Sequence, residues 1–144
     1  MNFQYNDGGR TEAGYLGYSY DCVCRAIAIA TNKPYSEVYD ALNAIAVEHE
    51  HIGKHKRHIS SARNGVYRQT WQTYLEQLGW KWTPTMSIGS GCKVHLRENE
   101  LPMGRIIAAV SKHLVAIIDG TIHDTSDPSR NGSRCVYGYW RKLS

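Results

Sequence analysis

The chain changes its rhythm of apolar residues near position 100, and this change limits the folds open to it. In the first part, apolar residues recur at the three- and four-residue spacing of amphipathic helices. In the last part, the short segments RIIAAV, HLVAII and TIHDT are rich in branched apolar residues, which indicates strands. We therefore expect an α+β fold in which N-terminal helices pack on a C-terminal antiparallel β-sheet of about four to six strands.

The expected helices have an apolar stripe and a recognisable start or end. The first contains the run DCVCRAIAIAT and begins near Cys22, with alanines that permit close packing. Residues 1–20 place Gly among Tyr and indicate an irregular lead-in, whereas residues 49–65 are polar and indicate an exposed loop or a frayed helix end. The expected helices are residues 21–31, 34–49 and 66–79.

The Asp119–Gly120 pair is the strongest hairpin signal in the chain, because both residues accept the positive φ of a two-residue turn. Such a turn sets His113 opposite Ser126 and brings Asp124 diagonally close to His113 on one sheet face. The expected strands are residues 105–110, 113–119, 121–125 and 135–140.

The bulk properties describe an ordinary globular chain. Its 144 residues, 42% of them apolar, suit a single domain over residues 1–144 with its own core. No run is long and apolar enough to cross a membrane, and the start MNFQYNDGGR lacks the apolar run of a secretory signal. Four cysteines are few for a disulfide scaffold, so we expect free thiols in a reducing compartment.

Three residues are candidates for nucleophilic chemistry. Cys22 stands at a helix start, where backbone N–H groups and the helix dipole favour a thiolate and can hold an oxyanion. His113 begins a strand and can supply the imidazole that such a thiolate needs. Asp124, across the hairpin, can fix the imidazole tautomer. Each residue also has a plainer interpretation: Cys22 as a small apolar residue, His113 as structural, and Asp124 as a turn cap.

The motifs DCVCRAIAIAT and KHLVAIIDGTIHDTSD resemble the papain-like cysteine peptidase superfamily, especially small bacterial and phage-encoded members near the C39 and NlpC-like groups. The resemblance implies a Cys22 nucleophile, a His113 base and an Asp124 orienting acid. It also implies a cytoplasmic protein of a bacterium or a phage-infected host cell. These enzymes often carry an upstream Gln as oxyanion donor, at a position that Leu16 occupies here. The backbone N–H of Cys22, with Ser19 or Gln4, is then the candidate oxyanion hole.

The polar loop carries two competing signals. His49, His51, His55 and His58 form a cluster, and the last three would share one face if the segment were helical. The HExxH pattern is absent, however, and neighbouring Lys and Arg would repel a cation, so we expect no metal. A basic patch lies near Trp71 and indicates nucleic-acid binding, a solvated face or a substrate-docking surface. Its members are Lys54, Lys56, Arg57, Arg63 and Arg68.

Taken together, these patterns predict a cysteine hydrolase of the peptidase, amidase or isopeptidase type, which works through an acyl-enzyme on a peptide or protein substrate and needs no cofactor. Two alternatives stay open: an inactive papain-like binding module, and a basic nucleic-acid-binding protein. We expect no membrane association, and the sequence leaves the oligomeric state open.

Overall fold

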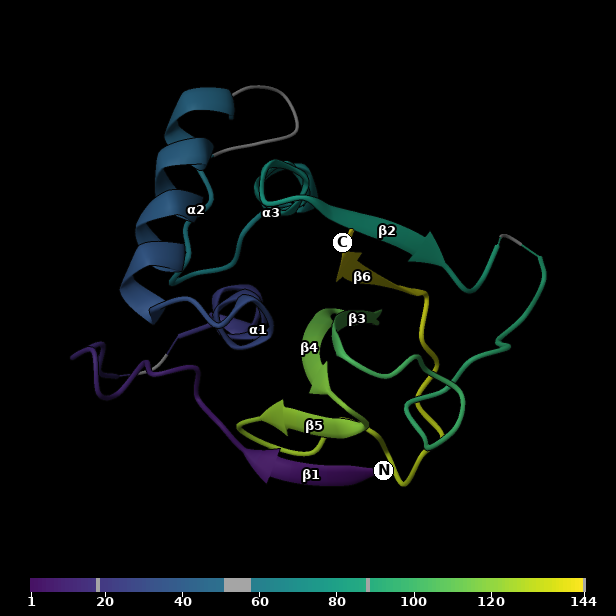
Figure 1. Cartoon of the computed structure of the whole chain (residues 1–144). Coiled ribbons are helices and arrows are strands. Elements are labelled where there is room, and N and C mark those ends of the chain that lie inside the picture. The colour runs from purple at the N-terminus through teal and green to yellow at the C-terminus, as the bar shows by residue number, and fades with distance from the viewer. Residues whose placement is uncertain (18, 51–57, 88, 144) are drawn as a thin grey trace.

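Helices and strands follow one another largely in the expected order. The structure, a computed structural model, describes residues 1–17, 19–50, 58–87 and 89–143 (Figure 1). The helices are α1 (Cys22–Thr31), α2 (Tyr35–His49) and α3 (Arg68–Gln77). The strands are β1 (Asn2–Tyr5), β2 (Trp80–Pro84), β3 (Arg105–Val110), β4 (His113–Ile118), β5 (Thr121–Asp124) and β6 (Gly138–Lys142). The expected helices are confirmed, and the last expected strand is displaced toward the C-terminus.

The strands form one six-stranded sheet in the order β1-β5-β4-β3-β6-β2. The expectation of a purely antiparallel sheet is wrong at one edge, because β1 pairs in parallel with β5. The four residues of β1, NFQY, alternate between polar and aromatic, but the run is short and all four are exposed, so it was not recognised as a strand. The mixed sheet keeps the α+β class and places the N-terminal strand beside the C-terminal hairpin.

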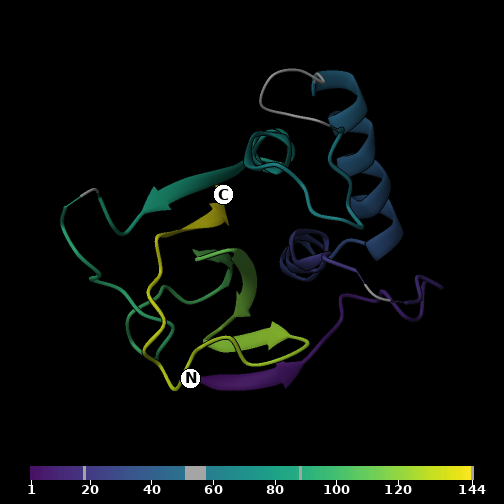
Figure 2. The same ribbon diagram turned by 180° about the vertical axis from the view of Figure 1, so that it is seen from behind.

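The helices cover one face of the sheet and loops cover the other (Figures 1 and 2). On the helix side, Ile27, Leu42 and Leu75 pack with Ile107 and Trp140 of the sheet. A second buried cluster lies between the opposite face and the loops, and its members include Leu96, Ile106, Val115, Ile117, Ile122 and Val136. Both faces of the central strands are therefore buried, and the cluster on the helix side holds these strands against α1.

Helix α1 lies against β4 and is apolar over almost its whole length. Its buried residues include Ala26, Ile27 and Ala30, and the small alanines allow neighbouring elements to approach closely. The helix ends at Asn32, which adopts a left-handed conformation (φ 56°) and donates its N–H to the last carbonyls. The packing of α1 leaves only its first residue, Cys22, its one arginine, Arg25, and its last residue, Thr31, partly exposed.

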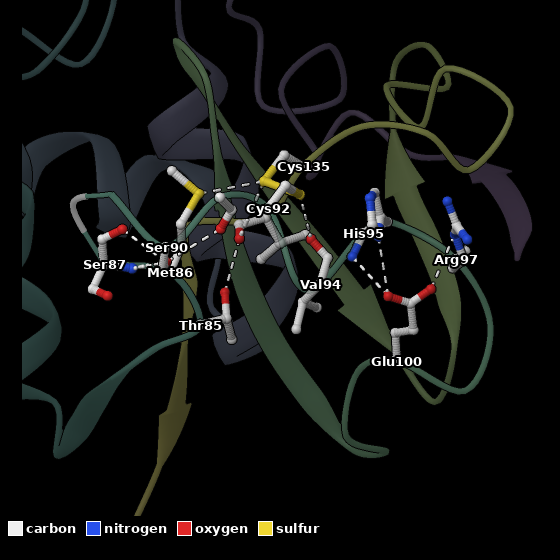
Figure 3. The surroundings of a disulfide bond; sticks show 12 residues. Thr85, Met86, Ser87, Ser90, Cys92, Val94, His95, Arg97, Glu100 and Cys135 are labelled. Atoms are coloured by element: carbon white, nitrogen blue, oxygen red, sulfur yellow. Dashed lines mark hydrogen bonds and ion pairs between the residues drawn. A yellow bond between two sulfur atoms is a disulfide. The ribbon is translucent and has the colours of Figure 1, made fainter.

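The loop face carries a disulfide between Cys92 and Cys135 (Figure 3). The expectation that all four thiols are free is therefore wrong for this pair. The two cysteines are 43 residues apart in sequence, so no local pattern indicated that they meet. Backbone hydrogen bonds between Leu96 and Arg134, and between Val136 and Val94, bring the two segments together. Among the described residues, no helix is long and apolar enough to cross a bilayer.

Candidate active site

A cleft of about 660 Å³ opens where the start of α1, the segment before α3 and the β3–β4 turn meet. Cys22 and His113 both line it, from α1 and β4 respectively. The remaining walls come from backbone and side chains far apart in the sequence, among them Ser19, Val66, Trp71 and Tyr137. The cleft is thus a product of the tertiary fold.

The structure brings Cys22, His113 and Asp124 together. Nε2 of His113 lies 2.6 Å from Oδ2 of Asp124. Cys22 lines the same cleft as His113, and each of the two side chains shifts the pKa of the other; because Nε2 faces Asp124, Nδ1 is the ring nitrogen left for the sulfur. The side chain of Asp124 is only 7% exposed and that of His113 is 21% exposed, so water screens their contact poorly.

The expected hairpin supplies this geometry. Asp119 and Gly120 both have positive φ, at 48° and 80°, and Ile118 pairs with Thr121 across the two-residue turn. The turn and its register are therefore confirmed. Because the register is set at the turn, the carboxylate of Asp124 arrives beside the imidazole at the start of β4.

The environment of Cys22 and His113 favours a thiolate and an imidazolium. Burial alone would raise the pKa of Cys22, but the hydrogen bond and positive charge of His113 outweigh it and lower that pKa. The backbone N–H of Leu114 and the charge of Arg25 lower it further. Burial likewise works against the charged ring of His113, yet its hydrogen bonds to Asp124 and Cys22 raise its pKa to about 9.

The first turn of α1 keeps its backbone donors available. Asp21 occupies the N-cap position, but its side chain makes no capping hydrogen bond. Both Cys22 and Val23 line the cleft at this helix start. Uncapped N–H groups at a helix N-terminus attract negative charge, so the backbone of Cys22 can stabilise an oxyanion that forms on its own side chain.

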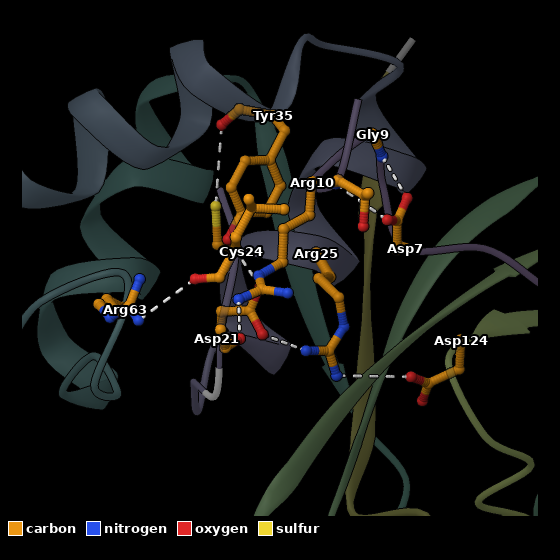
Figure 4. A network of polar contacts seen from close by, with 12 residues as sticks. Asp7, Gly9, Arg10, Asp21, Cys24, Arg25, Tyr35, Arg63 and Asp124 are labelled. Carbon is orange, nitrogen blue, oxygen red and sulfur yellow. Dashed lines mark hydrogen bonds and ion pairs between the residues drawn. The ribbon is translucent and has the colours of Figure 1, made fainter. Parts of the chain in front are cut away.

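A buried ionic chain links the start of α1 to Asp124 (Figure 4). The guanidinium of Arg25 pairs with Asp21 and also lies 3.6 Å from Oδ1 of Asp124. Asp21 is held in turn by the Tyr35 hydroxyl at 2.6 Å and by Arg10 at 3.3 Å. The Asp124 carboxylate is consequently fixed through both oxygens, one toward His113 and the other toward Arg25.

Sequence analysis did not single out Arg25, although one signal for it was present. Asp21 and Arg25 stand four residues apart, which is the spacing of an ion pair on one helix face. The contact of Arg25 with Asp124 joins residues 99 positions apart by their numbering, and only the tertiary fold reveals it.

Cys24 lies in a different environment from Cys22. Its side chain is 0% exposed, and burial raises its pKa to about 12. Its sulfur lies 3.9 Å from the carbonyl oxygen of Tyr35, at the start of α2. The thiol of Cys24 is therefore neutral and packed in the core.

The candidate oxyanion donors differ in position. Ser19 lines the cleft near Cys22. Gln4 does not, because it lies on β1 at the sheet edge, where its exposed amide donates to the carbonyl of Tyr5. The structure therefore leaves the backbone N–H of Cys22 and Ser19 as candidates, and it does not bring Gln4 to the site.

The basic patch is described only in part. Lys54, Lys56 and Arg57 lie outside the described residues, as do His51 and His55 of the histidine cluster. Arg63 lies near the carbonyl of Leu16, at 3.4 Å. Arg68 lines the cleft, with its guanidinium 5.4 Å from the Trp71 ring and 5.0 Å from the Trp82 ring. Within the described ranges, no group of three His, Cys, Asp or Glu side chains is placed to hold a metal ion.

Comparison with models of known families, with curated proteins and with solved structures found no match in any of the three. The chemistry of the cleft has to be inferred from its own residues. A thiol, an imidazole and a carboxylate in series, beside free helix N–H groups, are suited to nucleophilic attack on a carbonyl.

Proposed function

We propose that this chain is a cysteine hydrolase of the papain-like type, in which Cys22 is the nucleophile, His113 the acid and base, and Asp124 the orienting carboxylate. The observation that carries the proposal is that Cys22 and His113 line one cleft and shift each other's pKa, while Asp124 lies 2.6 Å from the His113 ring. If His113 were only structural, a thiol beside it at a cleft would have no purpose. If Cys22 were only a small apolar residue, nothing in its surroundings would need to lower its pKa.

The reaction begins with the thiolate of Cys22 attacking the carbonyl carbon of an amide. A sulfur–carbon bond forms, the carbonyl π electrons move to oxygen, and N–H groups at the start of α1 stabilise the oxyanion. The intermediate collapses as the carbon–nitrogen bond breaks, and the proton of the His113 imidazolium passes to the departing amine. A thioester on Cys22 and a neutral His113 remain.

Hydrolysis of the thioester restores the starting state. Neutral His113 takes a proton from water, and the resulting hydroxide attacks the thioester carbon. The carbon–sulfur bond breaks, a carboxylic acid leaves, and Cys22 and His113 regain their ion pair. Asp124 supports both steps because its contact with Nε2 keeps Nδ1 directed at the sulfur and stabilises the charged ring.

The proposed substrates are peptides or proteins, cleaved at an amide or isopeptide bond without a cofactor. We also place the enzyme in the cytoplasm of a bacterium or a phage-infected host cell, as its resemblance to small papain-like members implies. In a reducing cytoplasm Cys92 and Cys135 would be held as thiols. Neither cysteine lines the cleft, so the proposed chemistry does not require their disulfide.

A test of this proposal is covalent trapping with a panel of short peptides that carry thiol-directed acyl warheads, followed by mass mapping of the labelled residue. We expect one adduct, on Cys22, which hydroxylamine releases as the acyl hydroxamate. Cys22→Ala should abolish the adduct, and the matched variant Cys24→Ala should retain it. Equal labelling of Cys22 and Cys24, or no adduct from any member of the panel, would favour an inactive binding module.

A further inference from the structure

The charged residues that line the cleft are not balanced. Asp21 contributes a carboxylate, but it is buried and already bonded to Arg10, Arg25 and Tyr35. Arg25 is similarly engaged, between Asp21 and Asp124. In the ion pair that the proposed function requires, the charges of Cys22 and His113 offset each other. These pairings leave two cations on the cleft wall, Arg68 and Lys112.

Neither of these two cations is paired with an acid. Within the part of the chain that the structure describes, no carboxylate lies within ion-pair distance of Arg68 or Lys112. A cleft that presents two unneutralised cations beside a reactive thiol attracts anionic ligands and repels cationic ones.

The position of Arg68 is not explained by helix stability. It is the first residue of α3, where the helix dipole disfavours positive charge, and the first turn contains no acidic residue. The guanidinium instead packs over the rings of Trp71 and Trp82. A contact with two aromatic rings limits the positions that the guanidinium can adopt, and a guanidinium can bind a carboxylate through two parallel hydrogen bonds, so Arg68 is suited to a carboxylate ligand.

Lys112 stands at a position that its own backbone disfavours. It occupies the two-residue turn between Val110 and His113, with a left-handed φ of 58°. Gly, Asn or Asp adopt this conformation with less strain than Lys. The turn places Lys112 directly before His113, and both residues line the cleft.

We propose that the cleft recognises a peptide substrate that carries a carboxylate close to the scissile carbonyl, with Arg68 as its bidentate partner and Lys112 as a second positive charge. This inference rests on the proposed function and names its substrate class. The carboxylate belongs either to an acidic side chain or to a free peptide C-terminus. Two cations in a cleft of about 660 Å³ suit one carboxylate better than the extended row of phosphates along a nucleic acid.

The experiment measures binding to the Cys22→Ala protein, so that its outcome does not depend on turnover. Four pentapeptides of otherwise equal sequence are titrated by calorimetry: one with a central Glu and blocked ends, one with Gln, one with Lys, and one with Gln and a free C-terminal carboxylate. We expect the Glu peptide or the free-carboxylate peptide to bind about tenfold more tightly than the blocked Gln peptide. Whichever binds more tightly identifies the source of the carboxylate, and the Lys peptide should bind most weakly.

Variants of the same protein assign the preference to its residues. Arg68→Gln should remove most of the preference for the carboxylate, and Lys112→Gln should remove part of it. Lys81→Gln, an exposed substitution on β2 outside the cleft, should leave the preference unchanged. Circular dichroism checks that each variant is folded. In the Cys22→Ala protein itself, high salt should reduce the preference for the carboxylate peptide, and this test of the electrostatic contribution needs no further substitution.

The inference is overturned if the Glu, Gln and free-carboxylate peptides bind equally, if none binds, or if Lys112→Gln and high salt leave the preference intact. It is also overturned if a random oligonucleotide displaces the peptides and binds more tightly than they do, which would favour nucleic-acid binding. A wild-type enzyme that forms the Cys22 acyl adduct equally from acidic and neutral peptides would refute the inference alone. The absence of any adduct, with acidic peptides still bound, would refute only the hydrolase.

Discussion

Cys22 and Cys24 lie two positions apart on α1, and the pKa values of their thiols are shifted in opposite directions. Cys22 is at the mouth of the helix, beside His113 and the N–H of Leu114, and its pKa is lowered. Cys24 faces α2 in the core, and burial raises its pKa to about 12. Burial acts in the same direction on both thiols, so burial alone does not separate them.

The difference between the two thiols comes from what each one contacts. Cys22 has an imidazole beside it whose protonated form Asp124 stabilises, whereas Cys24 meets a peptide carbonyl, which can only accept a hydrogen bond. A reactive cysteine in this fold therefore requires both a helix start and a strand that supplies the ring. The predictions below test each part of this comparison, from the largest expected effect on Cys22 to the smallest.

Exchanging the two cysteines for alanine, one at a time, should separate chemistry from packing. Cys22→Ala should lower the acylation rate with an activated ester by on the order of 10⁴-fold or more, because the nucleophile is gone. Cys24→Ala should leave that rate within about threefold and reduce the free energy of unfolding by about 1 kcal/mol, because it leaves a small void. Stopped-flow acylation and urea denaturation measure the two effects. Comparable rate losses in both variants would contradict the comparison.

His113→Gln should have the next largest effect. Without the imidazole, the pKa of Cys22 loses its strongest lowering influence and rises, and proton transfer to the leaving group is lost. We expect a loss of about 10²- to 10⁴-fold in acylation near neutral pH. The rate should recover in part at alkaline pH, where the thiol ionises without help. An unchanged rate near neutrality would mean that His113 has no role in the chemistry.

Asp124→Asn tests the support behind the imidazole. Asp124 contributes the hydrogen bond and the charge that raise the pKa of His113 to about 9, so its neutral replacement should lower that pKa. The alkaline limb of the pH–rate profile, which reports loss of the imidazolium, should therefore move to lower pH. We expect a rate loss of about 10- to 100-fold, since a hydrogen bond to a charged group contributes roughly 1.5–3 kcal/mol. An alkaline limb that stays near its wild-type position would contradict this role.

Arg25→Gln should have the smallest effect, because Arg25 is a positioning residue that acts through Asp124 and through its charge. Its charge lowers the pKa of Cys22, so the acid limb of the pH–rate profile should move to higher pH. The expected rate loss is about fivefold or less, in line with a partly exposed ion pair. Arg25→Lys should return the acid limb of the pH–rate profile close to its wild-type position but should restore the rate less. Lys keeps the positive charge, but it lacks the guanidinium that contacts both Asp21 and Asp124. A rate loss without any change in the limb would indicate a purely structural residue.

The parts of the site that the sequence predicted are those set by local rules. A helix start at Cys22 and a two-residue turn at Asp119–Gly120 are local features, and the turn alone fixes which residue of β5 lies beside His113. The candidate triad followed from these two features. Taken one at a time, Cys22, His113 and Asp124 give no indication that they belong to one site.

The parts that were missed depend on contacts between distant segments. Strand β1 consists of four exposed residues, and its pairing with β5 has no sequence signal. The Cys92–Cys135 disulfide spans 43 residues, and the expectation of free thiols came from the small number of cysteines and the absence of a secretory signal. Gln4 was selected for its residue type alone, and the sheet carries it away from the cleft.

Glu50, the residue that follows the end of α2, is a further feature that the sequence did not predict. Glu50 is almost fully buried and accepts hydrogen bonds from Ser60 and from the Thr70 hydroxyl, at the start of α3. Sequence analysis assigned residues 49–65 to an exposed loop, which is wrong for Glu50 and Ser60. Polar residues at a loop's ends can be buried wherever their partners come from another element, and composition does not show those partners.

The most direct test of the ionised Cys22 is the pH dependence of its alkylation by iodoacetamide, with Cys24 of the same molecule as the internal reference and peptide mapping to separate them. The lowered pKa of Cys22 predicts labelling that begins at a lower pH than for an ordinary thiol, while Cys24, whose pKa burial raises to about 12, stays unlabelled. Labelling of Cys22 that begins only at alkaline pH, or that follows the same curve as Cys24, would contradict the account.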